Sequence, residues 1–316
     1  MAIKLYACGG TGTAAASRVA KSMNTFTGGK NVLVADTSDS NINQGEFPDV
    51  FILPKLPNDY DGSGKLRSKN AEAIKKYVPK VLDQYPPEEY NIVISSGGGG
   101  SGSVFAPYIA QSIIDSGKIC FIIITNNVGS LKAMDNTFNT HKSYISMNKG
   151  KCVPMFVVDN TDIKKADANV DYIISAIDTL VSTNNYGLDG SDILNFLRWD
   201  KVTEQSAGPA IITVVKDNIP AEIKDIISVL TLSTEMKEPC FSFVPEYTAA
   251  GVYDKDIINQ DNFPDTHFVI SKSAYAEMFN ALQSGLEKEK KRVQNNRSAS
   301  DSVELNFTAD DDNIVL

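Results

Sequence analysis

A glycine-rich stretch in the first third of the chain has the residue types and spacing of a phosphate-binding loop. A short β-branched run, Ile92–Ile94, leads into four glycines, Gly97–Gly100, and then into Ser101 and Gly102. Apolar residues at helical spacing begin at Val104. Glycines let backbone N–H groups approach an anion, and the start of a helix adds partial positive charge. No lysine follows the glycines, so this is not the lysine-bearing P-loop.

A second glycine loop follows the first strand-like segment, Ile3–Ala7. It contains three glycines and two threonines, which are Gly9, Gly10, Thr11, Gly12 and Thr13. Alone this is a weak signal, because many dinucleotide-binding folds begin this way and carry an acid such as Asp36 at the end of the second strand. Two glycine loops at the carboxyl ends of two strands can, however, hold one polyphosphate from both sides.

A third loop contains Gly62, Ser63 and Gly64 between Asp61 and Lys65. An ordinary surface turn explains this composition as well as a functional loop does. In the functional interpretation, the loop covers the terminal phosphate and senses its presence.

Two carboxylates, Asp189 and Asp192, lie three residues apart after a long helical pattern. On one turn they can orient a water molecule or help to hold Mg²⁺. From the spacing alone, a plainer explanation is more common: Asp189 caps a helix, and Asp192 is an acid in its first turn.

The elements that must position these residues alternate between strand and helix over the first half of the chain. Apolar runs predict strands at Ile3–Ala7, Asn31–Ala35, Asn91–Ser95, Ile119–Thr125 and Val153–Val158. Helical patterns lie near residues 13–26, 69–83, 103–115 and 131–148. This alternation predicts a doubly wound, Rossmann-like parallel sheet of the α/β class.

The second half of the chain has a different pattern. One apolar stripe predicts a long central helix at about 166–185, which ends at a turn signal, Asn184–Gly187. Beyond it we expect a smaller α+β domain. Its strands are predicted at Ala210–Val215, Cys240–Val244 and His267–Ser271, and its helices at about 220–231 and 273–294.

We therefore expect four segments: a nucleotide-binding domain at 1–165, the central helix and acidic loop at 166–200, a C-terminal α+β domain at 201–296 and an acidic tail at 297–316. The tail has no Lys or Arg after Arg297 but keeps apolar residues near its end. It is either a disordered, solubilising terminus or a segment that orders against a partner.

The composition limits the classes of ligand. The 316 residues have a net charge of −9 and no basic cluster, which disfavours direct binding of nucleic acid or of an anionic membrane. No apolar run approaches the roughly 20 residues that span a bilayer, and the N-terminus enters a strand directly, so we expect a cytoplasmic protein without a signal peptide. Cysteines and histidines are scattered, which predicts buried thiols and neither a zinc site nor a His-dependent triad. They are Cys8, Cys120, Cys152, Cys240, His141 and His267.

Together these motifs resemble the tubulin/FtsZ superfamily of filament-forming GTPases. The signature of that family is Gly-Gly-Gly-(Ser/Thr)-Gly-(Ser/Thr)-Gly between a strand and a helix. This chain has Gly98–Ser103 followed by Val104 in place of the last glycine. The likeness is greatest to the phage-encoded tubulins of the PhuZ type. These match in the first glycine loop, in Asp36-Thr37, in the Asp189/Asp192 pair and in a short acidic tail that ends in apolar residues.

The resemblance implies a role for each motif. Asp36 and Thr37 would lie near the phosphate-bound Mg²⁺, and the third loop would lie near the γ-phosphate. The phosphates of GTP or GDP would be bound by the first loop, 9–13, and by Gly98, Gly99, Gly100, Ser101, Gly102 and Ser103. Ribose and base would be faced by Asp159, Asn160, Asn169 and Asp171. Asp189 and Asp192 would act on the nucleotide of the neighbouring subunit, so hydrolysis would require assembly.

The same resemblance implies a GTPase that polymerises head to tail into dynamic filaments in the host bacterial cytoplasm. Such filaments would position phage DNA or the replication compartment. One alternative is an NAD-dependent Rossmann oxidoreductase, which would use loop 9–12 and Asp36 but leave Gly97–Gly102, the acid pair and the tail unexplained. A second alternative is a tubulin-like scaffold that does not hydrolyse GTP. Turnover that rises steeply with protein concentration distinguishes the first interpretation from both alternatives.

Overall fold

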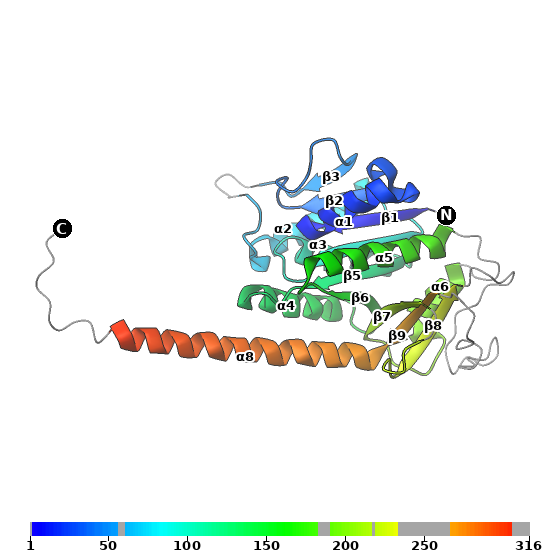
Figure 1. The fold of residues 1–316 in the computed structure, drawn as a ribbon. Coiled ribbons are helices and arrows are strands. Elements are labelled where there is room, and N and C mark those ends of the chain that lie inside the picture. The colour runs from blue at the N-terminus through cyan, green and yellow to red at the C-terminus, as the bar shows by residue number, and fades with distance from the viewer. Residues whose placement is uncertain (1, 56–60, 183–189, 217–218, 233–265, 305–316) are drawn as a thin grey trace, which may run out of the picture.

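The computed structural model describes residues 2–55, 61–182, 190–216, 219–232 and 266–304, with the side chains of the last helix described as far as Asn296. Within these residues, nine strands form one sheet in the order β3-β2-β1-β4-β5-β6-β7-β9-β8 (Figure 1). Pairing is parallel from β3 to β7, and antiparallel where β9 joins β7 and β8. The fold class predicted from the sequence is confirmed.

The central strands β1, β2, β4 and β5 are almost entirely buried, as expected where helices cover both faces of a sheet, whereas the edge strand β3 is half-buried. Their β-branched and aromatic residues suit such a doubly packed surface. The bounds are β1 Ile3–Cys8, β2 Val32–Asp36, β3 Asp49–Ile52, β4 Tyr90–Ser96, β5 Ile119–Asn126, β6 Val153–Asp159, β7 Pro209–Lys216, β8 Ile226–Leu232 and β9 Thr266–Ser271.

Helices cover the two faces of the sheet in separate groups (Figure 1). The helical bounds are α1 Gly9–Ser22, α2 Arg67–Gln84, α3 Gly102–Asp115, α4 Leu131–Met147, α5 Ile163–Ser182, α6 Gly190–Leu197 and α8 Lys272–Glu304, with short 3₁₀ turns η1 Asn24–Gly29 and η2 Trp199–Lys201. The apolar cluster on one face takes residues from α1, α5 and α6. The cluster on the other face takes them from α2, α3, α4 and α8.

One predicted element is wrong. The helix expected at about 220–231 is strand β8, which pairs antiparallel with β9 from Ile226↔Ser271 to Leu232↔Thr266. Short apolar runs do not distinguish helix from strand by spacing alone, and here β-branched residues and sheet pairing decide the conformation. Strand β3 was not predicted, whereas α6, with Asp192 in its first turn, is the helix that the plainer explanation of this acid required. The predicted strand Cys240–Val244 lies outside the described residues.

The C-terminal strands continue the main sheet, because β7 pairs in parallel with β6 at Val153↔Pro209. The domain boundaries remain a prediction, since one sheet runs through both halves of the chain. Helix α8 lies along α4 and extends beyond it (Figure 1), and it continues to Glu304, past the expected start of the tail at 297. Residues 305–316 lie outside the described part of the chain.

The cysteines and histidines of the described residues belong to the interior. Cys8, Cys120 and Cys152 are free thiols and buried, as expected, while Cys240 is outside the described residues. His141 is buried, with Nε2 2.9 Å from Asn126 Oδ1, and burial lowers its pKa to about 4. His267 is buried, with Nδ1 2.8 Å from Thr231 Oγ1. No helix in the described residues is long and apolar enough to cross a membrane.

Candidate functional site

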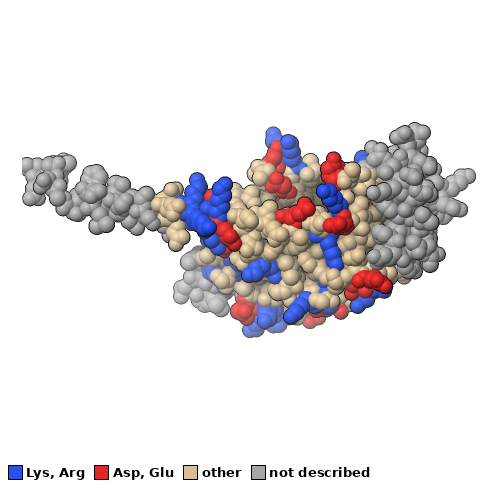
Figure 2. Space-filling model, turned by 90° about the horizontal axis from the view of Figure 1, so that it is seen from below, with Lys and Arg blue, Asp and Glu red and all other residues tan. Residues whose placement is uncertain are grey.

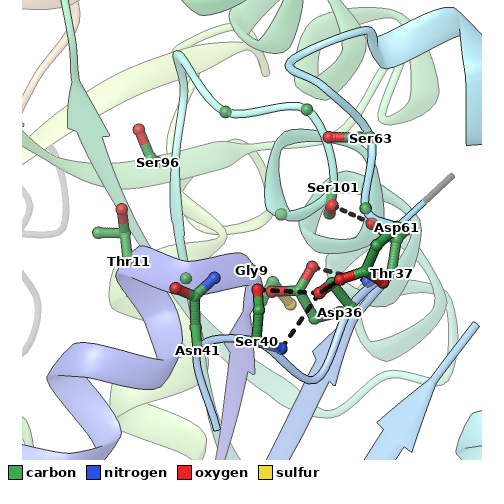
Figure 3. Close-up of a pocket in the computed structure, with 17 residues that line it drawn as sticks. Gly9, Thr11, Asp36, Thr37, Ser40, Asn41, Asp61, Ser63, Ser96 and Ser101 are labelled. Carbon is green, nitrogen blue, oxygen red and sulfur yellow. Dashed lines mark hydrogen bonds between the residues drawn. The ribbon is translucent and has the colours of Figure 1, made fainter.

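A cavity of about 250 Å³ opens at the carboxyl ends of β1, β2 and β4 (Figure 3). Strand β1 leads into α1 on one face of the sheet, and its neighbour β4 leads into α3 on the other face. This is the point at which the strand order reverses, where doubly wound sheets bind their ligands. The topology therefore places the cavity where a ligand site is expected.

Two helix N-termini meet at this cavity. Helix α1 begins at Gly9 directly after β1, and α3 begins at Gly102 directly after the glycine run. Neither N-cap residue, Cys8 or Ser101, makes a side-chain capping bond, and neither helix has an acid in its first turn. Their first N–H groups and positive dipole ends are thus left to an anion, and two such ends together suit a polyphosphate.

Glycine is required where the two helices touch. A Cβ on Gly102 would lie 2.2 Å from the carbonyl oxygen of Cys8, and a Cβ on Gly9 would lie 2.8 Å from the amide nitrogen of Gly102. Gly9 also has a φ of +71°, which favours glycine. Gly12 does not line the cavity but lets α1 pack closely against β1, because a Cβ there would lie 2.7 Å from the carbonyl carbon of Ala7.

The third loop, 61–65, closes the cavity from a second side. Asp61, Gly62 and Ser63 line it, and a Cβ on Gly100 would lie 2.0 Å from Ser63 Oγ. Figure 3 shows Ser63 and Asp61 facing the glycine run and the end of β2. The functional interpretation of this loop therefore gains support from its position against the glycine run.

The end of β2 supplies a network of hydroxyl and carboxylate groups. Thr37 and Ser101 hydroxyls are 2.5 Å apart, which joins the end of β2 to the glycine run. Ser38 donates to Asp61 Oδ2 at 2.6 Å, which joins it to the third loop. Asp36 accepts the Thr37 N–H at 2.6 Å (Figure 3). Three segments that are distant in the sequence thus enclose one space.

Asp36 is the buried carboxyl group of this network, with 4% of its surface exposed. Burial raises its pKa above the usual range, and the nearby charge of Asp61 adds to that effect, while the Thr37 N–H opposes it. The described lining contains no Lys or Arg. A cation that enters with a ligand would therefore find negative charge in Asp36 and in Asp61, which also forms an ion pair with Lys55 outside the lining. Phosphate would depend on backbone N–H groups.

Most of the residues that the sequence singled out for phosphate binding meet at the cavity. The lining includes Gly9, Gly10, Thr11, Asp36, Thr37, Gly62, Ser63, Gly99, Gly100, Ser101 and Gly102. It does not include Gly12, Thr13, Gly64, Gly98 or Ser103. The sequence reasoning missed Cys8, Ser38, Ser40, Asn41, Asp61 and Ser96 as lining residues. Three of these residues, Ser38, Ser40 and Asn41, belong to the polar run that follows Asp36, and this run could have identified them.

Two of the residues outside the lining brace the loops that form it. Thr13 donates to the carbonyl of Gly9 at 3.1 Å, and Ser103 donates to the carbonyl of Gly99 at 2.7 Å. Val104, which replaces the last glycine of the family signature, is 4% exposed and packs in the apolar cluster of α2 and α3. The departure from the signature thus contributes to helix packing.

The four residues expected near ribose and base do not line the cavity. Asp159 accepts hydrogen bonds from the N–H and hydroxyl of Thr161, and the Asn160 N–H donates to Asn126. Asn169 is exposed on α5, and Asp171 is paired with Arg18 at 2.9 Å. Their roles toward a nucleotide remain predictions.

The predicted catalytic acids are separate from the cavity. Asp189 lies outside the described residues, and Asp192 is half-buried in the first turn of α6. Gly190, where α6 begins, lies beside Glu89 and Tyr90 at the amino end of β4, and the glycine run follows the carboxyl end of that strand. At about 3.3 Å per residue, seven strand residues span roughly 20 Å. Asp192 therefore cannot reach the cavity of its own molecule.

No family model matches the chain. Individual proteins, however, are similar to it over most of its length. A phage tubulin-like protein of Pseudomonas phage 201phi2-1 is 29% identical over 88% of this chain and 87% of its own length. A phage tubulin-like protein of Pseudomonas phage phiKZ is 22% identical over 99% of this chain and 98% of its own length.

Two solved structures share the fold over the whole of this chain. A TubZ protofilament from bacteriophage PhiKZ has a TM-score of 0.77, and the phage tubulin PhuZ with GDP has a TM-score of 0.74. In each case the identity is 20% and the match covers 96% of the solved chain. Sequence relatives and solved structures together confirm that this chain resembles the tubulin/FtsZ superfamily and, within it, the phage tubulins of the PhuZ type.

Proposed function

We propose that the cavity binds the phosphates of a guanine nucleotide and that the chain is a GTPase that assembles head to tail into filaments. The observation that carries this proposal is the meeting of two uncapped helix starts, α1 and α3, at the switch point of a tubulin-like sheet. The similar proteins point the same way. PhuZ was solved with GDP, TubZ of PhiKZ as a protofilament and PhuZ201 as a filament.

Mg²⁺ fits this site as an ion carried by the nucleotide. Among the described residues, no three His, Cys, Asp or Glu side chains cluster to hold a metal by themselves. The oxygen groups around the cavity suit a hard cation, and Asp36 and Asp61 would supply negative charge beside it. When bound, Mg²⁺ would neutralise phosphate charge, while the backbone N–H groups of the glycine loops orient the phosphates.

Hydrolysis would require a second copy of the chain. The carboxylates of the described lining are Asp36 and Asp61, and both are engaged in hydrogen bonds within the site. Asp192 supplies a carboxylate at the other end of the sheet, so a head-to-tail neighbour would bring it to the nucleotide. Asp189, three residues earlier in the sequence, is the second acid that we propose for this role. Such a heterologous contact does not close and gives an open filament.

The biological role that we propose is the positioning of phage DNA or of the replication compartment in the infected bacterium. It rests on analogy with the phage tubulins, because fold alone does not determine function. An NAD-dependent oxidoreductase is a weaker explanation, because it would use loop 9–12 and leave the second glycine run unexplained. Residues of both glycine loops line the same cavity. A scaffold that does not hydrolyse GTP predicts filaments without GTP turnover, whereas our proposal predicts turnover that rises with assembly.

The test is GTP turnover as a function of protein concentration, with polymer measured in parallel by sedimentation. A site shared between subunits predicts negligible turnover below the assembly concentration and a steep rise above it. Turnover per molecule that is independent of concentration would contradict the shared site. Filaments without turnover would favour the scaffold alternative, and the absence of guanine-nucleotide binding would contradict the proposal as a whole.

The acidic tail would dock on the neighbouring subunit in the same filament. A groove of about 470 Å³ lies between α2, α3 and α4. It is lined by three basic residues, one acid and several apolar groups, which include Lys65, Arg67, Lys132, Asp135, Leu66, Val104, Pro107, Tyr108 and Met147. The tail combines Asp310–Asp312 with Phe307 and the apolar end Ile314–Leu316, so it complements the groove in charge and in apolar character.

Figure 2 shows a second group of basic side chains toward the end of α8. The helix sequence supplies Lys288, Lys290, Lys291 and Arg292, a local basic group that the sequence reasoning overlooked because it alternates with Glu287 and Glu289. Deletion of 305–316, which leaves α8 intact, should abolish polymer in a light-scattering assay while the monomer stays folded. Lys132→Glu should weaken assembly through the groove, and Lys291→Glu would do so only if the α8 group receives the tail. Normal assembly of the deletion variant would contradict tail docking.

A further inference from the structure

The side chain of Asn136 on α4 joins two of the loops that form the cavity. Its Nδ2 lies 2.9 Å from the carbonyl oxygen of Lys65, 3.2 Å from that of Gly98 and 3.3 Å from that of Gly99. Because carbonyl oxygens only accept hydrogen bonds, this atom must be the amide nitrogen. The side chain is 6% exposed, so these bonds form away from bulk water.

The two loops that Asn136 joins contact each other directly at the cavity. Ser63 of loop 61–65 lies against Gly100 of the glycine run, where an added Cβ would come within 2.0 Å of Ser63 Oγ. A movement of one loop therefore requires the other to move or to lose this contact.

Neighbouring side chains of α4 hold one loop each. Lys132 Nζ donates to the carbonyl of Gly64 at 3.0 Å, which involves loop 61–65 alone. Thr140 Oγ1 donates to the carbonyl of Gly97 at 2.9 Å and accepts a hydrogen bond from Arg67 at the start of α2, so it contacts the glycine run but not loop 61–65 itself. Among the hydrogen bonds of the described residues, Asn136 is the α4 side chain that donates to both loops.

The backbone at the end of loop 61–65 is held in an unfavourable conformation. Lys65 has a φ of +60°, which lies in the left-handed region that residues with a Cβ disfavour. Such residues persist where their surroundings fix them. The bond from Asn136 to the Lys65 carbonyl is one of the contacts that fix this residue, so its loss favours other conformations of the loop.

We propose that Asn136 is a positioning residue that couples the glycine run to loop 61–65, so that phosphate bound on the first sets the position of the second. This inference rests on the proposed function, because it requires a guanine nucleotide in the cavity. The diphosphate would engage the glycine run, and the terminal phosphate of a triphosphate would in addition meet loop 61–65. Asn136 thereby contributes to the distinction between triphosphate and diphosphate.

The test is amide hydrogen exchange of the full chain, free and with GDP, in the wild type and in three variants. Asn136→Leu keeps the approximate size of the side chain and removes the donor. Thr140→Val and Lys132→Met are matched controls that each release one loop. Asn136→Ser, which retains a donor too short to reach both loops, replaces Asn136→Leu if that variant does not fold.

In the wild type, we expect GDP to slow exchange in both 97–102 and 61–66. In the Asn136 variant, protection of 97–102 should persist, while protection of 61–66 should fall about tenfold, as expected for the loss of buried hydrogen bonds. The ratio of GDP to GTP dissociation constants should fall as well. A general loss of stability would lower protection of both segments equally, so this pattern separates positioning from folding.

Three outcomes would overturn the inference. Equal protection of 61–66 in the wild type and in the Asn136 variant would contradict the coupling while leaving the proposed function intact. A selective loss of protection of 61–66 in Thr140→Val, equal to that in Asn136→Leu, would assign the coupling to helix α4 as a whole instead of to Asn136. A wild type in which GDP protects neither segment would contradict the proposed function and this inference together.

Discussion

The family resemblance assigns phosphate-binding loops and catalytic acids to one site. In this chain the loops lie at the carboxyl end of the sheet, and Asp192 lies at the amino end. At the carboxyl end, backbone groups of two helix starts and three loops enclose a cavity. At the amino end, α6 begins beside Glu89 and Tyr90 and carries Asp192 in its first turn. In Figure 1, α6 lies on the side of the sheet where β1 begins. The carboxyl end is suited to hold phosphate, and the amino end offers the carboxylate of Asp192.

This difference explains why a single copy is incomplete. Under the proposed function, the cavity would bind phosphate through main-chain groups that are fixed by the core of the sheet, so the cavity is formed in a single copy of the chain. Asp192 lies roughly 20 Å away along β4 and can act on a nucleotide only from another molecule. Assembly and hydrolysis are therefore expected to be coupled by geometry, without any change of conformation in the monomer.

The largest expected effect is at the cavity. Gly102→Ala would place a Cβ 2.2 Å from the Cys8 carbonyl oxygen, so the two helix starts must separate. We expect guanine-nucleotide affinity to fall more than about 100-fold and stability to fall by about 1–3 kcal/mol. Isothermal titration calorimetry measures the affinity, and denaturant unfolding measures the stability. Gly129→Ala is the control, because its Cβ would lie 3.5 Å from Asn127 Oδ1 and meets no backbone. Undiminished affinity in Gly102→Ala would contradict the account of the cavity.

The next effect is at the other end of the sheet. Asp192→Asn should lower GTP turnover by about 100-fold, the usual contribution of a group that handles a proton or orients water. Nucleotide affinity and filament formation should stay unchanged, because the cavity is untouched. Asp115→Asn, which alters an exposed carboxylate paired with Lys151, is the matched control and should leave turnover unchanged. Phosphate release at the wild-type rate by Asp192→Asn would remove this residue from the mechanism.

The smallest effect concerns the buried charge of Asp36. Burial holds the pKa of this carboxyl above its usual value in the folded protein. A raised pKa stabilises the fold below the unfolded-state pKa of about 4, and that contribution is lost as pH rises through the folded-state pKa. Asp36→Asn should therefore raise the Tm of the nucleotide-free protein at pH 7 by a few degrees at most. The gain should shrink as pH approaches 4, and a gain that grows on acidification would contradict this sign.

The sequence predicted most of the glycines that meet at the cavity, because their positions depend on backbone conformation. Glycine runs such as Gly97–Gly102 report directly where the main chain must approach another group, and the strands before them are continuous apolar runs. The order of these runs was enough to predict a doubly wound sheet. Side chains that line the cavity by proximity, such as Asn41 and Ser96, carry no such signal in their spacing.

Other features depend on contacts between distant segments. Ile226–Leu232 is a strand because β9 lies beside it, and an isolated apolar run does not report that neighbour. The pairing of Asp171 with Arg18, 153 residues away, is likewise invisible in the sequence, although it determines what this acid faces. Loop 61–65 had two open interpretations because only the fold brings Ser63 against Gly100.

Complementation between two defective variants tests the shared site most directly. Gly99→Leu would fill the cavity that Gly99 lines, and it should not shift the backbone, since the nearest atom to its Cβ is 3.8 Å away. Asp192→Asn removes the acid but keeps the cavity. Each variant alone should show almost no GTP turnover. In a 1:1 mixture, about a quarter of the head-to-tail contacts would pair an intact cavity with an intact Asp192, so turnover should recover to about a quarter of the wild-type rate. Mixed filaments that sediment together but recover no turnover would contradict the account.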